Sequence, residues 1–293
     1  MGVLLSLVEQ MKDTVQILDT ASYLKGRTVA QSTQMKILRQ MVRMSQVDQA
    51  LRLELDRGKL TYFLSQAGNE AFHVGVAFGL KGGDWLFPMS TLPTRRGHNM
   101  TADIPGLNVV QASSPGASRL VHANGTAWAA KLAGEKAVSC VTFGESIANQ
   151  DNFHVALNFA GVHQTPALFV CMTPGGYKDT AGEDIAGRAI AYGFSGMRVD
   201  GTDPLAVQKV IGEAARKARG GKGPTLIEAV WPEKTDESPV ERFARNLKVS
   251  VEDLEMTEEE VEGQVKLALS RFGNADPKDC VFGEDDPRMS KGS

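Results

Sequence analysis

The sequence predicts an α/β protein in which a central, mostly parallel sheet is covered by helices on both faces. Short apolar runs of strand length alternate along the chain with segments whose apolar residues recur at helical spacing. The strand-like runs are almost entirely apolar, which is typical of parallel strands buried on both faces. One stretch, residues 137–172, has the order strand, glycine turn, helix and strand, which is a βαβ unit.

We expect the functional site to form around this βαβ unit. Its first strand is expected at Ala137–Phe143, its helix at 151–161 and its second strand at Ala167–Met172. Ligands of parallel α/β sheets bind outside the carboxyl ends of the strands. The turn at 144–146 and the segment at 173–177 follow the two strands, so both are expected to face a ligand.

Composition excludes several classes of protein. The chain has 293 residues, 42% of them hydrophobic, which is enough for a large core. A net charge of -3, with Lys and Arg spread along the chain, argues against a nucleic-acid partner. Cys140, Cys171 and Cys280 lack the spacing of metal ligands and fit a reducing, cytoplasmic setting. The amino terminus has no secretory signal pattern and no apolar stretch reaches membrane-spanning length, so no membrane partner is expected.

Helical patterns flank the sheet-forming region. Apolar residues recur at helical spacing over Leu4–Leu18 and over Met35–Leu55, where Gly58 is the expected end of the helix. We therefore divide the chain into an amino-terminal helical extension (1–31), a main domain (32–272) and a polar, mobile tail (273–293).

A short helix is expected at Ala71–Leu80, with Asn69 as its candidate cap. Gly75 and Gly79 lie four residues apart on this helix, which indicates close approach of another element. His73 lies among apolar residues of the same helix. A buried core histidine and a catalytic histidine are both open interpretations.

Two turns allow a structural and a functional interpretation. After an expected strand at Trp85–Phe87, a loop over Pro88–Pro105 carries Arg95-Arg96-Gly97-His98 at its tip. This tip is either a solvated turn or an anion-binding site, because guanidinium groups suit phosphate and carboxylate. Ser113-Ser114-Pro115-Gly116 precedes an expected helix at 118–133 and is either an ordinary turn or an anion-binding nest.

The carboxyl-terminal half continues the alternation of helices and strands. Asp203 is a candidate cap and Pro204 suits the first position of a helix that runs to Arg219. Thr257 and Glu260 have the spacing of a capping box for the last helix. The other expected elements are a helix at Asp184–Tyr192, strands at Met197–Val199 and Thr225–Ala229, and helices at Pro239–Leu247 and Thr257–Phe272.

An ordered series of segments extends over roughly residues 32–272. Its members are Gly68–Ala71 with His73, Asn152–His154 through Leu157–Ala160, Ala186–Gly193, Arg198–Val207, Pro224–Val230 and Pro239–Phe243. The series resembles the α subunit of the thiamine diphosphate-dependent first component of 2-oxo acid dehydrogenase complexes, the family of the pyruvate, branched-chain and acetoin enzymes.

This resemblance implies the thiamine diphosphate-binding fold and an α subunit that works with a β subunit in an α2β2 heterotetramer. It implies an oxidoreductase that decarboxylates a small-molecule 2-oxo acid and passes the acyl group to a lipoyl carrier, with a lipoyl acyltransferase core as a further expected partner. Thiamine diphosphate and magnesium are the cofactors that it implies, and the thiamine group carries the carbanion chemistry.

The resemblance also implies a metal site. In this family a glycine, an acidic residue and a glycine are followed at a fixed distance by paired asparagines. Here Gly144-Glu145-Ser146 matches the first part, and Thr173-Pro174, which comes after the 26 residues Ile147–Met172, matches the second. Glu145 and Thr173 are thus the implied metal ligands, while Pro174 has no side-chain oxygen for magnesium. The implied cofactor-binding residues are Ser114, Gly116, Glu145, Ser146, Ile147 and Tyr177.

Two further departures from the family concern the same site. Where the family has a tyrosine-arginine pair that neutralises the diphosphate, this chain has Ser90-Thr91, for which Arg95 or Arg96 could substitute. Where the family has a histidine-rich loop with a catalytic histidine, residues 231–237 contain none, and no histidine follows His163. The match therefore assigns no catalytic residue.

The sequence leaves open whether the chain is an enzyme. The first hypothesis is an active α-subunit-like component of a thiamine diphosphate-dependent dehydrogenase. The second is a pseudoenzyme, a structural or regulatory subunit that keeps the fold and the partner interface but binds cofactor weakly or not at all. A third is a site for another anion, held by Arg95, Arg96 and the turn at Ser114. Thr173-Pro174 is the feature that separates the first two hypotheses.

Overall fold

The computed structural model of the chain describes residues 15–17, 29–58, 63, 65–89, 106–110, 116–174, 184–231 and 237–273. Some of the residues singled out in the sequence lie outside these ranges, namely Ser90, Thr91, Arg95, Arg96, Ser114, Tyr177, Cys280 and the predicted tail. The division into three segments at residues 31 and 272 stays a prediction.

Seven strands form one sheet in the order β1-β6-β7-β5-β4-β2-β3, and every described pairing is parallel. The strands are β1 (Val15–Ile17), β2 (Trp85–Phe87), β3 (Asn108–Val109), β4 (Ser139–Gly144), β5 (Ala167–Thr173), β6 (Ser195–Asp200) and β7 (Thr225–Val230). The predicted α/β class with a parallel sheet is thereby confirmed.

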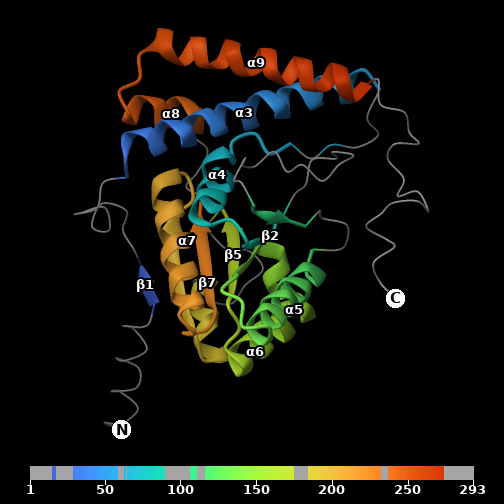
Figure 1. The fold of residues 1–293 in the computed structure, drawn as a ribbon, viewed down its shortest axis with the longest axis vertical. Coiled ribbons are helices and arrows are strands. Elements are labelled where there is room, and N and C mark those ends of the chain that lie inside the picture. The colour runs from blue at the N-terminus through green and yellow to red at the C-terminus, as the bar shows by residue number, and fades with distance from the viewer. Residues whose placement is uncertain are drawn as a thin grey trace.

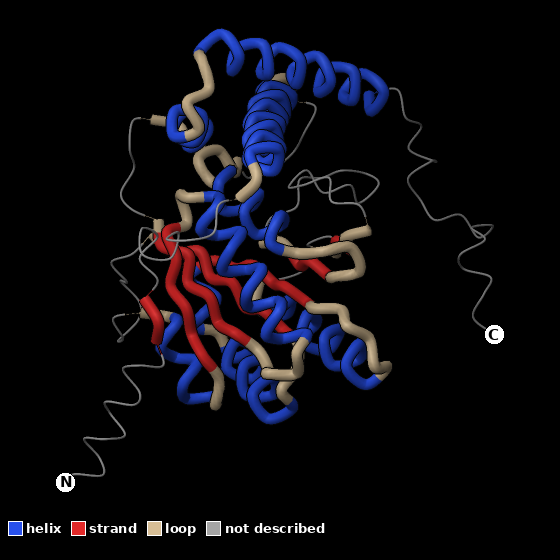
Figure 2. The backbone as a smooth tube through the Cα atoms, turned by 60° about the vertical axis from the view of Figure 1, so that its left-hand side comes forward, coloured by secondary structure: helices blue, strands red, loops and turns tan. Residues whose placement is uncertain are grey.

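Helices cover both faces of the sheet (Figure 2). Neighbouring residues of each central strand point to opposite faces, so each strand packs against both helical layers. On one face, α4 (Glu70–Gly79) and α7 (Pro204–Arg219) pack on Cys140, Leu168 and Val170. On the other face, α5 (Ser118–Leu132), α6 (Asp151–His163) and η2 (Ala186–Tyr192) pack on Val141 and Phe169. The strands β4 and β5 are buried by both layers, which explains their nearly continuous apolar sequences.

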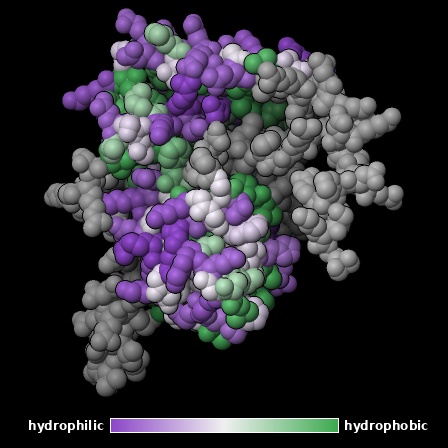
Figure 3. Space-filling view, viewed as in Figure 1, coloured by the Kyte–Doolittle hydropathy of each residue, from purple (hydrophilic) through white to green (hydrophobic). Residues whose placement is uncertain are grey.

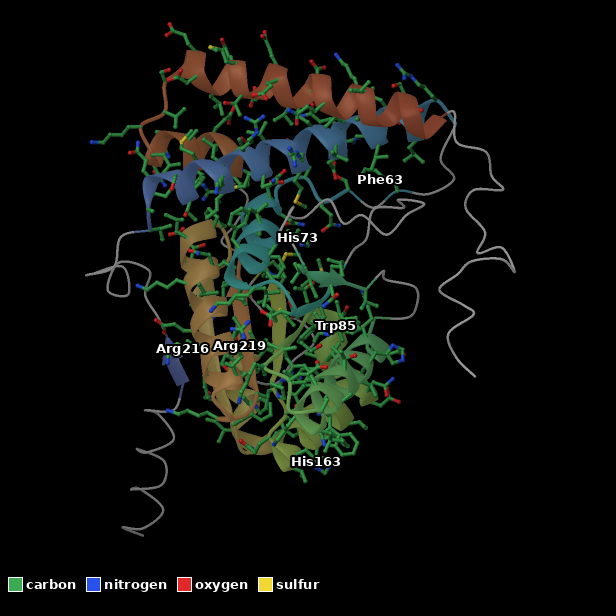
Figure 4. All side chains as sticks on the ribbon, in the orientation of Figure 1. Phe63, His73, Trp85, His163, Arg216 and Arg219 are labelled. Atoms are coloured by element: carbon green, nitrogen blue, oxygen red, sulfur yellow. The ribbon has the colours of Figure 1, made fainter. Side chains whose placement is uncertain are left out.

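A further group of helices lies beyond one end of the sheet (Figure 1). It consists of α3 (Gln31–Asp56), α8 (Pro239–Asn246) and α9 (Val251–Gly273), and α4 contributes Ala71 and Val74 to the same core. His163, which closes α6 shortly before β5 begins, lies at the opposite end of the molecule (Figure 4). Strand β5 therefore runs toward these helices, and the carboxyl edge of the sheet faces them.

The two glycines of α4 allow close contact with α7, as the sequence predicted. A Cβ atom at Gly75 would lie 2.7 Å from Val207 Cβ, and one at Gly79 would lie 2.5 Å from Ile211 Cβ. Any larger residue would push the two helices apart. On the same helix, His73 is buried, and its Nε2 lies 3.0 Å from Gln66 Oε1. The interpretation of His73 as a core histidine is the one that the structure supports.

Two predicted caps stand at helix starts, and a third prediction is wrong. Asp203 caps α7 by accepting hydrogen bonds from the Leu205 and Ala206 amides at 2.9 and 3.2 Å. Asn69 occupies the cap position of α4, but its side chain makes no capping hydrogen bond. The predicted capping box at Thr257 is wrong, because Thr257 lies within α9 and its hydroxyl donates to the Asp253 carbonyl at 2.8 Å.

One predicted helix is a strand in part, and another is of the 3₁₀ type. Residues Val15–Ile17, predicted as the end of an amino-terminal helix, form a strand that pairs with β6. The apolar spacing that suggested a helix cannot reveal this pairing, because it depends on a strand some 180 residues away. The helix predicted at Asp184–Tyr192 is present over Ala186–Tyr192 as a 3₁₀-helix, whose hydrogen bonds span one residue fewer than those of an α-helix.

Candidate functional site

The candidate site lies at the carboxyl ends of β4 and β5, the two central strands of the βαβ unit. These strands pair in parallel register, with Phe143 opposite Cys171 and Gly144 opposite Met172. The residues that follow the two strands are therefore neighbours, although some 26 residues separate them in sequence. The 3₁₀-helix η1 (Glu145–Asn149) begins directly after β4.

Glu145 and Thr173 meet at this edge. The Thr173 hydroxyl donates a hydrogen bond to Glu145 Oε2, with 3.1 Å between the oxygens. Thr173 is fully buried, and its carbonyl accepts a hydrogen bond from the Trp231 amide at 2.7 Å, so its position is fixed by the sheet. Pro174, the next residue, is exposed and has no side-chain oxygen. The contact uses Glu145 Oε2, and the second carboxylate oxygen, Oε1, takes no part in it.

Gly116 and Ile147, two of the predicted cofactor-binding residues, are also brought together. A Cβ atom at Gly116 would lie 2.3 Å from Ile147 Cδ1, so the isoleucine side chain fills the space that a larger residue would need. Ser146, between Glu145 and Ile147, is exposed. Of the six predicted cofactor-binding residues, four lie within the described part of the chain, while Ser114 and Tyr177 lie outside it.

Arg119 is a residue of this edge that the sequence did not single out. Its Nη1 atom donates to the carbonyl of Pro88 and to the carbonyl of Met89, the latter at 2.8 Å. The Met89 amide in turn donates to the Thr142 hydroxyl of β4 at 2.6 Å. Burial lowers the pKa of Arg119, and its Nε atom is buried without a hydrogen-bond partner among the described residues. A lone arginine in the first turn of a helix gives no sequence pattern that would have found it.

Glu228, on β7, is a second group that sequence reasoning missed. It is fully buried, and its Oε2 accepts hydrogen bonds from the amides of Ile185 and Ala186 at 3.0 and 2.9 Å. The Arg198 Nε atom lies 3.6 Å from the same oxygen. Burial raises the pKa of Glu228, and the negative charge of Glu145 raises it further. Glu228 thus fixes the start of η2 beneath the site.

The backbone of η1 is held by Arg188 of η2. Its Nη1 atom donates to the Ala148 carbonyl at 2.6 Å, and both terminal nitrogens lie 3.3 Å from Asn149 Oδ1. Because Glu145 is the first residue of η1, this contact also limits where its carboxylate can lie.

The oxygen donors of the site suit a magnesium ion only when phosphate and water complete its coordination. Within the described residues, no three His, Cys, Asp or Glu side chains are grouped in a way that could hold a metal. One carboxylate and one hydroxyl, Glu145 and Thr173, are what the matched positions offer. Magnesium commonly binds through one or two carboxylates, substrate phosphates and several waters. The donor set therefore fits magnesium bound together with a diphosphate.

Two other groups of reactive residues are structural. Burial raises the pKa of the Cys140 and Cys171 thiols, which keeps both in the neutral, unreactive form. His163, the last histidine in the sequence, lies at the end of the molecule away from the carboxyl edge (Figure 4).

None of the helices in the described ranges combines the length and the apolar character needed to cross a membrane.

Comparisons with known proteins place these residues in a wider context. Residues 92–231 match the family model of the dehydrogenase E1 component, and this range includes Gly116, Arg119, Glu145 and Thr173. The chain is 33% identical over 225 residues to the 2-oxoisovalerate dehydrogenase subunit alpha of Bacillus subtilis (strain 168), an alignment of 66% of this chain and 68% of that protein. It is 32% identical over 268 residues to the 3-methyl-2-oxobutanoate dehydrogenase subunit alpha of Mycobacterium tuberculosis (strain ATCC 25618 / H37Rv), with 77% and 72% covered. It is 34% identical over 221 residues to the pyruvate dehydrogenase E1 component subunit alpha of Bacillus subtilis (strain 168), with 67% and 58% covered.

Proposed function

Because the chain belongs to the dehydrogenase E1 component family, as a 2-oxo acid dehydrogenase α subunit, we propose that it binds thiamine diphosphate with magnesium and decarboxylates a 2-oxo acid oxidatively together with a β subunit. The observation that carries the proposal is the contact between Glu145 and Thr173 at the carboxyl ends of β4 and β5. It brings two oxygen-bearing side chains together at the edge of the sheet where ligands of parallel α/β proteins bind, which supports the proposal.

Each residue of the site has a defined part in this proposal. Glu145 Oε1 is the carboxylate oxygen that binds the metal, while its partner Oε2 is held by the Thr173 hydroxyl. The Thr173 hydroxyl oxygen is the second oxygen of the site that can contact the metal. Gly116 leaves room for the Ile147 side chain, and both are proposed cofactor contacts. Ser146, Ser114 and Tyr177 remain predicted cofactor contacts. Thiamine diphosphate, when bound, supplies the group that stabilises the carbanion left by decarboxylation.

A partner subunit is supported by exposed apolar residues on α5 and α6. These two helices pack side by side and expose Leu132 (70%), Val155 (56%) and Val162 (70%). Beside them the rings of Trp128 and Phe159 meet edge to face, with centroids 5.2 Å apart. Figure 3 shows hydrophobic surface at this end of the molecule. Exposed apolar patches of this kind mark protein interfaces. We assign the surface to contacts within an α2β2 assembly, which would pass its acyl product to a lipoyl acyltransferase core.

A second candidate is a subunit that keeps the fold and the partner but lacks activity. The observation that favours it is Pro174, because the residue beside Thr173 offers the metal no side-chain oxygen. The absence of any histidine after His163 points the same way, since the carboxyl-terminal part of the chain then offers no imidazole for proton transfer.

Calorimetry separates the two candidates. Thiamine diphosphate with magnesium is titrated into the full chain bound to its β subunit, and the titration is repeated with excess chelator and with Glu145→Gln. We expect binding that requires magnesium and that weakens on the order of 10- to 100-fold in the variant. No heat from a complex whose assembly is confirmed by light scattering would refute cofactor binding and support the inactive subunit.

A further inference from the structure

Arg119 occupies an unusual position between three elements of the candidate site. It is the second residue of α5, its guanidinium reaches the two residues that follow β2, and those residues are tied to β4 through Met89 and Thr142. A positive charge is therefore fixed at the same edge of the sheet as the Glu145 carboxylate, at the ends of the neighbouring strands.

Most of the hydrogen-bonding capacity of Arg119 is unused among the described residues. A guanidinium has five N–H donors. The described contacts are both made by Nη1, to the carbonyls of Pro88 and Met89, and Nε is buried without a partner. Burial without a carboxylate lowers the pKa of this group, because the charged form loses its hydration. An anion at the site would satisfy both the unused donors and the charge.

The unused side of the guanidinium faces predicted cofactor-binding residues. The Nη2 atom lies 3.9 Å from the position that a Cβ atom would take at Gly116, and Ile147 lies against the same position. Glu145 begins the 3₁₀-helix to which Ile147 belongs. The Nη2 atom of Arg119 thus lies close to Gly116 and Ile147, two of the predicted cofactor-binding residues.

We propose that Arg119 binds the diphosphate of the ligand at this site, with Nε and Nη2 as the donors. The proposal rests on the function proposed above. A guanidinium fork matches the spacing of phosphate oxygens and forms stronger hydrogen bonds than neutral donors do. It also supplies a positive charge at the end of β2, where Ser90-Thr91 follows in the sequence and brings no arginine.

A purely structural role for Arg119 makes a different prediction. In that case the guanidinium only fixes the end of β2, and any change that loosens this end would weaken binding as much as loss of the arginine. Thr142→Val loosens the same end, because it removes the acceptor of the Met89 amide and leaves Arg119 in place. Arg216→Gln, on an exposed position of α7, controls for the loss of one positive charge.

The test compares wild type, Arg119→Gln, Arg119→Lys and the two controls as full chains bound to the β subunit. Inorganic pyrophosphate and thiamine diphosphate, each with magnesium, are titrated by calorimetry, and the melting temperature of each complex is measured without ligand. We expect Arg119→Gln to weaken both ligands by about 10- to 100-fold. Arg119→Lys, which keeps the charge but not the fork, should lose less. Thr142→Val should lower the melting temperature and Arg216→Gln should change neither quantity, and both should keep their affinity for pyrophosphate.

The outcomes separate this inference from the proposed function. Equal losses of affinity in Arg119→Gln and Thr142→Val, or no loss in Arg119→Gln, would overturn the role of Arg119 while leaving cofactor binding intact. If wild type binds pyrophosphate but not thiamine diphosphate, the proposed function fails, and a loss of pyrophosphate binding in Arg119→Gln still supports the anion site. Binding of neither ligand to wild type would overturn both.

Discussion

Asp84 and Arg219 form a buried ion pair that joins the turn before β2 to the carboxyl end of α7. The Asp84 side chain is 1% exposed, and besides Arg219 it accepts hydrogen bonds from the amides of Lys81 and Val138 at 2.8 and 3.0 Å. The pair links residues 135 positions apart in the chain. It fixes β2 against β4 at the end of the sheet away from the candidate site.

Asp84→Ala should lower the free energy of unfolding by about 3 to 5 kcal/mol, because it leaves the Arg219 charge and two amides without their acceptor. Urea denaturation measures this change when the slope of the free energy of unfolding against urea concentration is the same in wild type and variant. Arg245→Ala is the matched control, since Arg245 pairs with Glu237 at the surface, and it should cost less than about 1 kcal/mol. Similar losses in both variants would show that the buried pair adds little.

Gly79→Val should destabilise the chain by several kcal/mol, on the order of the larger losses seen for overpacked cores. The new side chain would meet Ile211 and the Gln208 carbonyl on α7, and backbone cannot move aside easily. Gly263→Ala is the control on another helix, because nothing lies within 4 Å of its added Cβ. We expect it to raise the melting temperature slightly, since alanine favours helix over glycine. Equal melting temperatures for Gly79→Val and wild type would contradict the close contact.

His73 should make stability depend on pH in a defined window. Burial lowers the pKa of His73 from 6.5 to about 4, so the folded state keeps it neutral where the unfolded chain is protonated. The stability that the neutral His73 contributes is fully present above pH 6.5 and is lost as the pH falls from 6.5 toward 4. The loss in the free energy of unfolding is roughly 3 kcal/mol.

The measurement is the free energy of unfolding at several pH values for wild type and for His73→Asn, which does not titrate. The variant is expected to be less stable at neutral pH but to show a shallower fall between pH 6.5 and 4. The same fall in both proteins would show that other groups cause it.

The sequence predicted what depends on local pattern. Apart from β1, the central strands and helices and the cap at Asp203 follow from apolar runs and from residue types a few positions apart. The meeting of Glu145 and Thr173 followed from one further rule, that parallel strands end at the same edge. The start of α9 was predicted wrongly although it also depends on local pattern. Ser250 accepts a hydrogen bond from the Asp253 amide at 3.1 Å, so a second capping sequence precedes the one at Thr257.

What the sequence could not show depends on contacts across the fold. Arg119 contacts residues 30 and 31 positions earlier, and nothing near it in the sequence marks it as part of a site. Glu228 interrupts an apolar strand, and its partners lie more than 40 positions away in η2. Such groups become visible only when the elements are placed side by side, because an isolated charged residue has the same local pattern on a surface as in a core.

Pro174→Asn should strengthen magnesium-dependent binding of thiamine diphosphate by about 10-fold, because it adds a side-chain oxygen beside Thr173 at the edge of the sheet. The single change keeps the hydrogen bond from Thr173 to Glu145, whereas Thr173→Asn combined with Pro174→Asn replaces it with a second amide oxygen. Titrations at several magnesium concentrations separate metal affinity from cofactor affinity. If Pro174→Asn changes neither the magnesium affinity nor the thiamine diphosphate affinity, residue 174 is not a position that contacts the metal. A gain that persists in the presence of chelator would point to a direct contact with the cofactor rather than to a restored metal ligand.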